Sequence, residues 1–233
     1  MKRAHQVRRS IAAAVLLVGL GVVLFLHPDL YQSKMPSPPE TSSVEPAGEA
    51  AAVLNELEVK GRAPKTGYTR AQFGDGWQTK NGCDTRNVIL HRDLVNTKVN
   101  EKCQIESGLL HDPYTGKDIT FTRGAATSDD IQIDHVVALS DAWQSGAQQL
   151  TFDERVGLAN DPLELLAVDG PANQQKSDGD AATWLPSNKA FRCQYVARQI
   201  AVKKKYRLWV KPAEKDVIVR VLSVCPGQQL PLK

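Results

Sequence analysis

The string IQIDHVVALSDAW at residues 131–143 decides the fold, together with LANDPLELLAV at 158–168 and ANQQKSDGDAATWLP at 172–186. In the first string apolar and polar residues alternate as far as His135, which is typical of a half-buried strand. Asp134 and His135 are consecutive, so a regular strand directs their side chains to opposite faces. Both can therefore face one site only if the strand bends or ends at this point.

The region around the second string predicts a short helix followed by another strand. Thr151 and Glu154 have the spacing of a capping box, which begins a helix. The helix ends near Asn160, because Pro162 disfavours the helical conformation of the residue before it. Residues 163–168 are almost continuously apolar and are predicted to form the second strand.

The third string adds a helix with polar residues on one face. Pro171 follows an Asp-Gly turn and suits the first turn of a helix. Asn173 and Lys176 lie three residues apart, so they share a face of this helix. The three strings therefore predict strand, loop, strand and helix, with polar side chains able to converge from all of them.

The polar residues of these elements suit metal-assisted hydrolysis of a phosphodiester. Such hydrolysis requires a base that deprotonates water and a positive charge that neutralises the phosphoryl oxygens. His135 suits the first task, because histidine has an ordinary pKa of about 6.5 and is largely neutral near neutral pH. The oxygens of Asp134 and Asn173 are hard ligands that suit one Mg²⁺. The alternative is structural: Asp134 pairs with His135, while Asn160 and Asn173 belong to a helix end and a helix face.

The same strings resemble the HNH endonuclease superfamily, most closely a branch of secreted bacterial HNH proteins. That branch also carries a CDTRN string and a DPYTG turn, found here at residues 83–87 and 112–116, and the resemblance covers about residues 68–225. It implies an α+β domain built round a ββα-metal core at about residues 131–180. It also implies endonuclease activity that leaves a 5′-phosphate.

The resemblance implies a role for each polar residue of the core. His135 matches the general base, Asp134 and Asn173 match metal ligands, and Asn160 matches a residue that steadies the loop and the base. Lys176 matches a basic residue after the last letter of the motif and is grouped with the catalytic residues, its role left open. The last letter of the HNH motif is a histidine, but Asn173 occupies that position here, so the match is to the HNN variant. Paired Cys-x-x-Cys motifs are absent from the sequence, which argues against structural zinc.

The N-terminal segment predicts export. Four basic residues precede an uncharged apolar run from Ile11 to Leu26, the pattern of a signal peptide or a signal anchor within residues 1–30. No small-x-small cleavage site follows the run, which slightly favours an uncleaved membrane anchor with its positive end inside. Residues 31–52 are rich in Pro, Ser, Glu and Ala and predict a linker. Residues 53–233 then form one extracytoplasmic domain.

All four cysteines lie beyond the apolar run, at Cys83, Cys103, Cys193 and Cys225. An even number of cysteines in an exported domain predicts disulfides. Three connectivities are possible, and connectivity does not follow from sequence alone. Proximity along the chain favours Cys83 with Cys103 and Cys193 with Cys225.

The net charge of the chain does not indicate nucleic-acid binding, but one basic segment of the sequence does. The formal net charge is +3, but four of the 29 basic residues and none of the 26 acidic ones precede His27, so the remainder has 25 basic against 26 acidic residues, a net charge of −1. Residues 192–211 contain seven basic residues and no acidic one, with aromatic residues among them. A phosphate-binding surface and a solvated helix face each account for such a run.

The candidate contacts to nucleic acid are Lys203, Lys204, Lys205 and Arg207 in this run. Arg86 in the CDTRN string is a further candidate, because a guanidinium matches phosphate oxygens bidentately. A structural pair between Arg86 and an aspartate is the alternative.

The remaining motifs predict supporting structure. The DPYTG turn joins two expected strands at residues 104–110 and 118–122. A last helix begins at Pro212 and reaches about Val224. Three aromatic residues, Tyr68, Phe73 and Trp77, are assigned to the core rather than to a ligand platform.

The sequence thus predicts an extracytoplasmic endonuclease that depends on Mg²⁺ or another hard divalent ion such as Mn²⁺. DNA is favoured over RNA as substrate, although phosphate contacts read neither sequence nor sugar. No obligate protein partner is evident, and residues 11–26 contact the membrane if they remain uncleaved. The rival is a non-catalytic surface module that binds nucleic acid or a partner protein. A nuclease requires Asp134, His135 and Asn173 to converge in a solvent-open cleft, whereas the module requires only the basic, aromatic surface.

Overall fold

The computed structural model describes residues 46–125 and 127–231. Helices and short antiparallel sheets follow one another in mixed order, so the predicted mixture of helix and strand is confirmed. The signal or anchor segment predicted at residues 1–30 lies outside the described residues, and so does most of the linker predicted at 31–52. Among the described residues, no helix combines the length and the apolar character needed to cross a bilayer.

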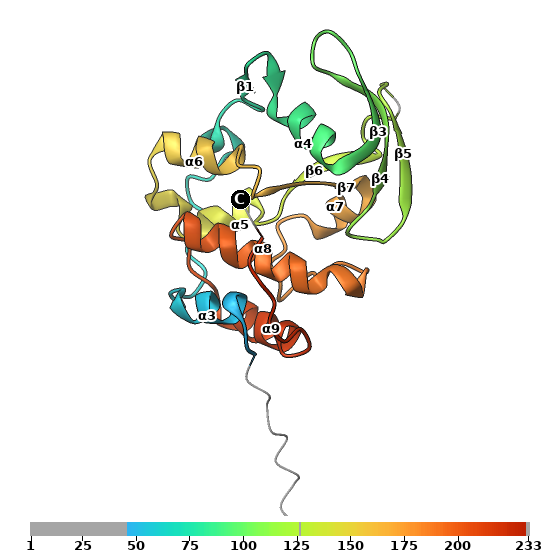
Figure 1. The fold of residues 1–233 in the computed structure, drawn as a ribbon. Coiled ribbons are helices and arrows are strands. Elements are labelled where there is room, and N and C mark those ends of the chain that lie inside the picture. The colour runs from blue at the N-terminus through green and yellow to red at the C-terminus, as the bar shows by residue number, and fades with distance from the viewer. Residues whose placement is uncertain (1–45, 126, 232–233) are drawn as a thin grey trace, which may run out of the picture. The chain divides into compact units, whose positions relative to one another are not determined.

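Two antiparallel strands, β6 (Ile131–His135) and β7 (Leu165–Asp169), lie in the middle of the fold (Figure 1). Their register is regular and places Ile131 opposite Asp169 and His135 opposite Leu165. Of the two possibilities at this point, a bend or a strand end, the structure has the second, because β6 ends at His135. Because the strand is regular up to its last residue, Asp134 and His135 project from opposite faces and contact different neighbours.

Two helices and a 3₁₀ turn connect the strands: α5 (Leu139–Gln144), η2 (Ala147–Gln149) and α6 (Phe152–Ala159). The capping box of Thr151 and Glu154 begins α6 as predicted, and Asn160 caps its C-terminal end. Helix α7 (Gly170–Lys176) follows β7 directly, and the Asp169 side chain accepts a hydrogen bond from the backbone N–H of Ala172 in its first turn. The predicted order of strand, loop, strand and helix is confirmed.

A second sheet has the order β3 (Leu94–Val99), β4 (Ile105–His111) and β5 (Asp118–Thr122) and forms the curved green ribbon in Figure 1. The strands predicted on either side of the DPYTG turn are β4 and β5. Helix α4 (Thr85–Asp93) packs between this sheet and β6–β7, where Ile89 and Leu90 join a core with Phe121 and Ile131. Before α4, the short pair β1 (Thr79–Lys80) and β2 (Cys83–Asp84) closes a turn.

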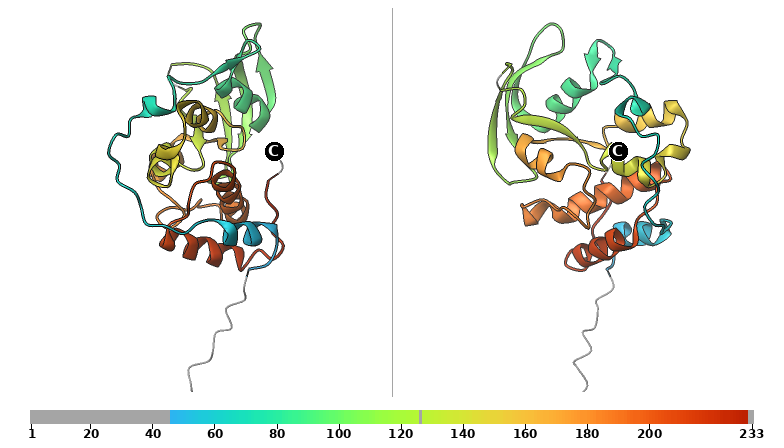
Figure 2. Two further views of the ribbon diagram at one scale, coloured as in Figure 1. Left: turned by 90° about the vertical axis from the view of Figure 1, so that its left-hand side faces the viewer. Right: turned by 180° about the vertical axis from the view of Figure 1, so that it is seen from behind.

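Three helices form a layer on the other side of β6–β7: α8 (Arg192–Lys205), α9 (Pro212–Leu222) and α3 (Glu49–Glu56). Figures 1 and 2 show α3 and α9 side by side beneath α8. The short turn η3 (Lys189–Phe191) leads into α8. Leu54, Ile200 and Ile218 are completely buried where the three helices meet.

The boundary predicted between linker and domain is wrong by a few residues. Helix α3 begins at Glu49, four residues before the predicted domain start at 53, and Ala50 and Ala51 are buried in the core. Glu and Ala are strong helix formers as well as common linker residues. Composition alone therefore did not separate the end of the linker from the first turn of α3.

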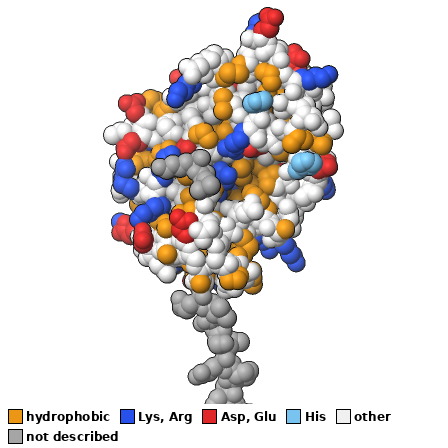
Figure 3. All heavy atoms as spheres, viewed as in Figure 1, with side chains coloured by type: hydrophobic (Ala, Val, Ile, Leu, Met, Phe, Trp, Pro, Cys, Tyr) orange, Lys and Arg blue, Asp and Glu red, His pale blue; other side chains and the backbone are white. Residues whose placement is uncertain are grey.

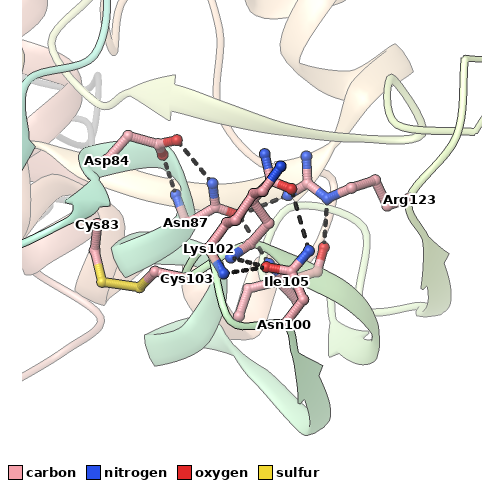
Figure 4. The surroundings of a disulfide bond; sticks show 9 residues. Cys83, Asp84, Asn87, Asn100, Lys102, Cys103, Ile105 and Arg123 are labelled. Carbon is pink, nitrogen blue, oxygen red and sulfur yellow. Dashed lines mark hydrogen bonds between the residues drawn. A yellow bond between two sulfur atoms is a disulfide. The ribbon is translucent and has the colours of Figure 1, made fainter.

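Both predicted disulfides are confirmed, Cys83–Cys103 and Cys193–Cys225. Figure 4 shows the first one beside the CDTRN string. There the Asp84 side chain accepts from the backbone N–H of Asn87 at the start of α4, and Asn87 Oδ1 accepts from Ile105 and from Arg123. The CDTRN string therefore joins α4 to the second sheet, and the other disulfide joins α8 to the end of α9.

Candidate active site

His135 ends β6 with its imidazole almost completely buried, 7% exposed. Its Nε2 lies 3.0 Å from the backbone carbonyl oxygen of Ala159. A carbonyl oxygen only accepts, so Nε2 carries the proton in the neutral ring and Nδ1 keeps its lone pair. The Trp77 ring stacks on the imidazole, with 5.6 Å between ring centroids and 10° between ring planes. The ring is thus held in one orientation and one tautomer.

The surroundings of His135 favour its neutral form. Burial lowers the pKa of His135 to about 3, and the positive charges of Arg70 and Lys176 act in the same direction. The hydrogen bond to Ala159 opposes this shift but does not cancel it. Because the protonated form is disfavoured, the ring is available to accept a proton at Nδ1 throughout the neutral pH range.

Asp134 points to the opposite side of the strand into a buried polar cluster. Its Oδ1 accepts from Lys176 Nζ at 2.9 Å, and its Oδ2 accepts from the Tyr114 hydroxyl. Lys176 also donates to the backbone carbonyl of His135 at 2.8 Å. Burial raises the pKa of Asp134, while Lys176 and Tyr114 favour its charged form. Lys176 is itself completely buried. Its two hydrogen bonds hold the C-terminal end of β6 in place.

The DPYTG turn supplies Tyr114 to this cluster. Asp112 stabilises the turn, because its side chain accepts from the backbone N–H of Thr115. The same carboxylate accepts from the backbone N–H of Asp169 at the end of β7. The turn between β4 and β5 is thus bound to the central strand pair, which places the Tyr114 hydroxyl beside Asp134.

Asn160 connects two segments that contact the His135 ring. Its Oδ1 accepts from the backbone N–H of Gln78 at 2.9 Å, and its Nδ2 donates to the carbonyl of Val156. Gln78 follows Trp77, the residue that stacks on His135, and Ala159 precedes Asn160. One asparagine therefore connects the residue that accepts from the His135 ring with the segment that covers it.

Asn173 lies on α7 with its Nδ2 donating to Gln132 Oε1 at 2.9 Å. This bond orients the amide, so that its Oδ1 is the atom left for another ligand. Asp134 accepts one hydrogen bond on each oxygen, and an ionised carboxylate has about four lone-pair directions. One carboxylate and one amide oxygen are ligand types that a hard divalent ion takes in proteins, where it keeps several of its waters.

No group of three or more His, Cys, Asp or Glu side chains that could hold a metal ion occurs within the described part of the chain. An ion at Asp134 and Asn173 would therefore depend on the amide oxygen and on water for the rest of its coordination. Such a site suits Mg²⁺ or Mn²⁺ better than zinc, which in proteins takes mainly nitrogen and sulfur ligands.

Asp134, His135 and Asn173 line one solvent-open pocket. Its wall also includes two arginines, Arg70 from η1 (Arg70–Phe73) and Arg86 from α4. Arg86 donates through Nη2 to the backbone carbonyls of Ser128 and Ile131, both at 3.0 Å. The alternative to a phosphate contact was a structural pair of Arg86 with an aspartate; Arg86 instead bonds to these two backbone carbonyls. The three residues predicted to converge thus line one pocket, but Asp134 is only 5% exposed and its carboxylate is held by Lys176 and Tyr114 on the other side of β6.

The basic run of α8 does not form a free basic surface. Lys203 is completely buried and bonds to Glu214 and to the carbonyl of Trp209, so its predicted contact with phosphate is wrong. Successive helical residues point about 100° apart, and Lys203 is the one that turns inward. Lys204, Lys205 and Arg207 remain at the surface, each paired with an acidic residue: Glu56, Asp161 and Glu154 respectively. Figure 3 shows basic and acidic side chains intermixed along the left of this face.

Sequence reasoning missed three residues of the site: Arg70, Trp77 and Tyr114. Trp77 and Tyr68 were assigned to the core, yet both line the pocket, whereas Phe73 is buried as predicted. The segment that carries Arg70 and Trp77 has no periodic pattern, so nothing in it indicated a contact with β6. Tyr114 lies in a string that was noticed, but as a turn and not as a partner of Asp134.

The chain is thus a mixed α/β protein. In its pocket the Asp134–His135 end of β6 and Asn173 of α7 lie together with two arginines. Residues 84–221 match the model of a family described as GmrSD restriction endonucleases, C-terminal domain, and the chain belongs to this family. A relative from Arthroderma benhamiae, named only as an uncharacterized secreted protein, is 38% identical over 194 residues, which cover 82% of this chain and 90% of the relative. No solved structure matches the chain. Membership places the protein among nuclease-related proteins; the HNH label and the bacterial branch stay predictions.

Proposed function

We propose that this protein is an extracytoplasmic, metal-dependent endonuclease that hydrolyses phosphodiester bonds, with DNA favoured over RNA. The family supports a nucleic-acid substrate. The observation that carries the proposal is the state of His135. Its Nε2 is committed to the Ala159 carbonyl, while Nδ1 has no hydrogen-bond partner among residues 46–125 and 127–231, in a side chain that lines the arginine-containing pocket.

The reaction follows from these groups. His135 Nδ1 takes a proton from a water molecule as the water oxygen bonds to phosphorus. The 3′ oxygen leaves and takes a proton from solvent, which gives the 5′-phosphate that the family resemblance implies. Asn160 and Trp77 keep the imidazole in place during this transfer. Lys176 and Tyr114 hold Asp134 and the strand end, and so they position the base without touching the substrate.

Asp134 and Asn173 are the residues that would hold Mg²⁺ or Mn²⁺. Such an ion, when bound, neutralises charge on the phosphoryl oxygens. We expect Asn173→Ala to raise the Mg²⁺ concentration needed for half-maximal cleavage or to abolish cleavage. Gln174→Ala is the matched control, because Gln174 is the next residue of α7 and is exposed.

The proposed location outside the cytoplasm rests on two observations. The chain contains two disulfides, which persist in oxidising compartments, and the relative from Arthroderma benhamiae is named as secreted. Retention in the membrane by residues 11–26 is a separate prediction. Fractionation of an exporting host tests it: an anchored chain stays with the membranes at full length, and a secreted chain appears in the medium without residues 1–30.

The deciding experiment incubates the purified protein with supercoiled plasmid and with single-stranded RNA, each with Mg²⁺ and with a chelator. We expect plasmid cleavage that depends on Mg²⁺ and is lost in His135→Ala, while that variant keeps its fold by circular dichroism and still binds duplex DNA. Cleavage at the wild-type rate by His135→Ala would refute the role of the base. Binding without cleavage by the wild-type protein would favour the non-catalytic module.

A further inference from the structure

The pocket contains a cation that the mechanism above does not use. Arg70 begins η1, and its side chain is exposed and lines the pocket together with His135. Within the described ranges, its guanidinium takes part in no hydrogen bond or ion pair. An unpaired guanidinium beside an uncommitted imidazole nitrogen is an arrangement for binding an oxyanion.

The backbone beneath Arg70 is firmly held, although the side chain is exposed. Arg155 of α6 donates to the carbonyl of Gln72 at 2.8 Å and to its side-chain oxygen at 3.0 Å. Phe73 is buried against Trp143. Gly74 follows with φ of 95°, a conformation that favours glycine, and a Cβ there would lie only 3.3 Å from Val156. These contacts fix η1 on α6 and so fix the position from which Arg70 reaches the pocket.

The other cations of the site are already engaged. Lys176 is completely buried and bonds to Asp134 and to the His135 carbonyl. Arg86 uses Nη2 for two backbone carbonyls. Lys65 pairs with Asp178 at 2.9 Å at the edge of the pocket. Arg70 alone among these cations presents its whole guanidinium to a ligand.

We propose that Arg70 binds the non-bridging oxygens of the scissile phosphate and is a catalytic residue of this protein. A planar guanidinium can donate two parallel hydrogen bonds to one phosphate and stabilise the charge that develops as water attacks. Arg70 lies before residue 84, where the family match begins, so the segment that precedes the matched region completes the active site. This role rests on the proposed nuclease function, but the phosphate-binding part can be measured without cleavage.

The experiment compares Arg70→Ala and Arg70→Lys with Arg220→Ala in the full chain. Arg220 is an exposed arginine on α9, and its substitution removes the same charge away from the pocket. We expect Arg70→Ala to lower single-turnover plasmid cleavage by roughly 100- to 1,000-fold, the loss typical for removing one donor to a developing oxyanion. Arg70→Lys should recover part of the rate because it keeps the charge but not the planar fork. Arg220→Ala should cleave like the wild-type protein.

A second readout measures binding of a labelled DNA duplex across a salt series with chelator present, in the His135→Ala background. Loss of one phosphate contact flattens the logarithmic salt slope by about 0.9. We expect this change for Arg70→Ala and none for Arg220→Ala. A merely structural Arg70 would instead change the urea midpoint and leave the slope intact.

The outcomes separate the two proposals. If the wild-type protein cleaves, and Arg70→Ala matches Arg220→Ala in both rate and salt slope, the role of Arg70 is overturned and the nuclease stands. If the wild-type protein does not cleave, the proposed function fails and the salt slope alone decides whether Arg70 binds phosphate. A flattened slope then supports the phosphate site, and an unchanged slope overturns it.

Discussion

Replacing His135 by Gln should change how the stability of the protein depends on pH. In the folded protein burial holds the pKa of His135 near 3, whereas in the unfolded chain it returns to about 6.5. Between these values the unfolded state binds a proton that the folded state does not. The folded state is therefore fully favoured above about pH 6.5 and loses stability as the pH falls towards 3, the opposite of a histidine that gains an acidic partner.

The magnitude follows from the shift. Each pH unit below about 6.5 costs about 1.4 kcal/mol, so the loss is about 2 kcal/mol at pH 5 and approaches 5 kcal/mol near pH 3. Glutamine keeps an amide N–H for the Ala159 carbonyl but does not titrate. His135→Gln should thus be less stable than the wild-type protein at neutral pH, because its packing on Trp77 is lost. The stability difference should shrink by about 2 kcal/mol between pH 6.5 and 5.

Urea unfolding at several pH values, with chelator present and disulfides intact, measures this difference. His91→Gln is the control for exchanging an imidazole for an amide, because His91 is exposed on α4 and, among residues 46–125 and 127–231, its side chain hydrogen-bonds only to Thr97. A constant difference between His135→Gln and wild type from about pH 7.5 to 5 would refute the reasoning. It would mean that the imidazole is solvated and not held as a buried neutral base.

Three further predictions concern the structure around the site. Lys203→Met leaves the buried Glu214 with Lys211 as its remaining cationic partner and should destabilise the fold by about 3 kcal/mol in urea unfolding, the low end of the cost of breaking a buried ion pair; a loss below about 1 kcal/mol would mean that Lys203 is solvated. Exchanging Cys83 and Cys103 together for Ser opens a loop with a sequence separation of 20 and should cost about 3 kcal/mol, whereas an unchanged urea midpoint would contradict a stabilising bond. Arg207→Gln, whose side chain is 67% exposed but paired with Glu154, should leave the salt slope of duplex binding unchanged; a slope flattened by about 0.9 would mean that Arg207 contacts phosphate despite this pair.

The features that the sequence predicted correctly depend on neighbouring residues. The capping box at Thr151, the stop at Pro162 and the strands beside the DPYTG turn each follow from a short string. The two disulfides also join cysteines that are neighbours along the chain. Local preference and short loops were sufficient in these cases because no distant segment had to be known.

The features that the sequence could not predict depend on distant segments meeting. Asp134 is bonded by Tyr114 and Lys176, 20 residues before it and 42 after it. Trp77 lies in a loop without secondary structure. It stacks on His135 because η1 packs on α6 and because Asn160 accepts a hydrogen bond from Gln78, the residue after Trp77. The inward direction of Lys203 depends on where Glu214 of α9 lies. None of these contacts leaves a pattern in a short stretch of sequence. The sequence therefore could not show which residues contact one another.

The charge of the pocket shows why an anionic substrate fits a protein whose residues 27–233 have a net charge of only −1. Lys176 balances Asp134, Lys65 balances Asp178, and burial keeps His135 neutral. Arg70 and Arg86 then leave the pocket wall with an excess of positive charge. The basic run of α8, by contrast, is neutralised by Glu214, Glu56, Asp161 and Glu154. The density of basic residues along the sequence therefore indicated α8 as the phosphate-binding segment. The positive charge available to a phosphate lies instead at Arg70 and Arg86. These two residues are 16 positions apart, in a part of the chain that shows no basic cluster.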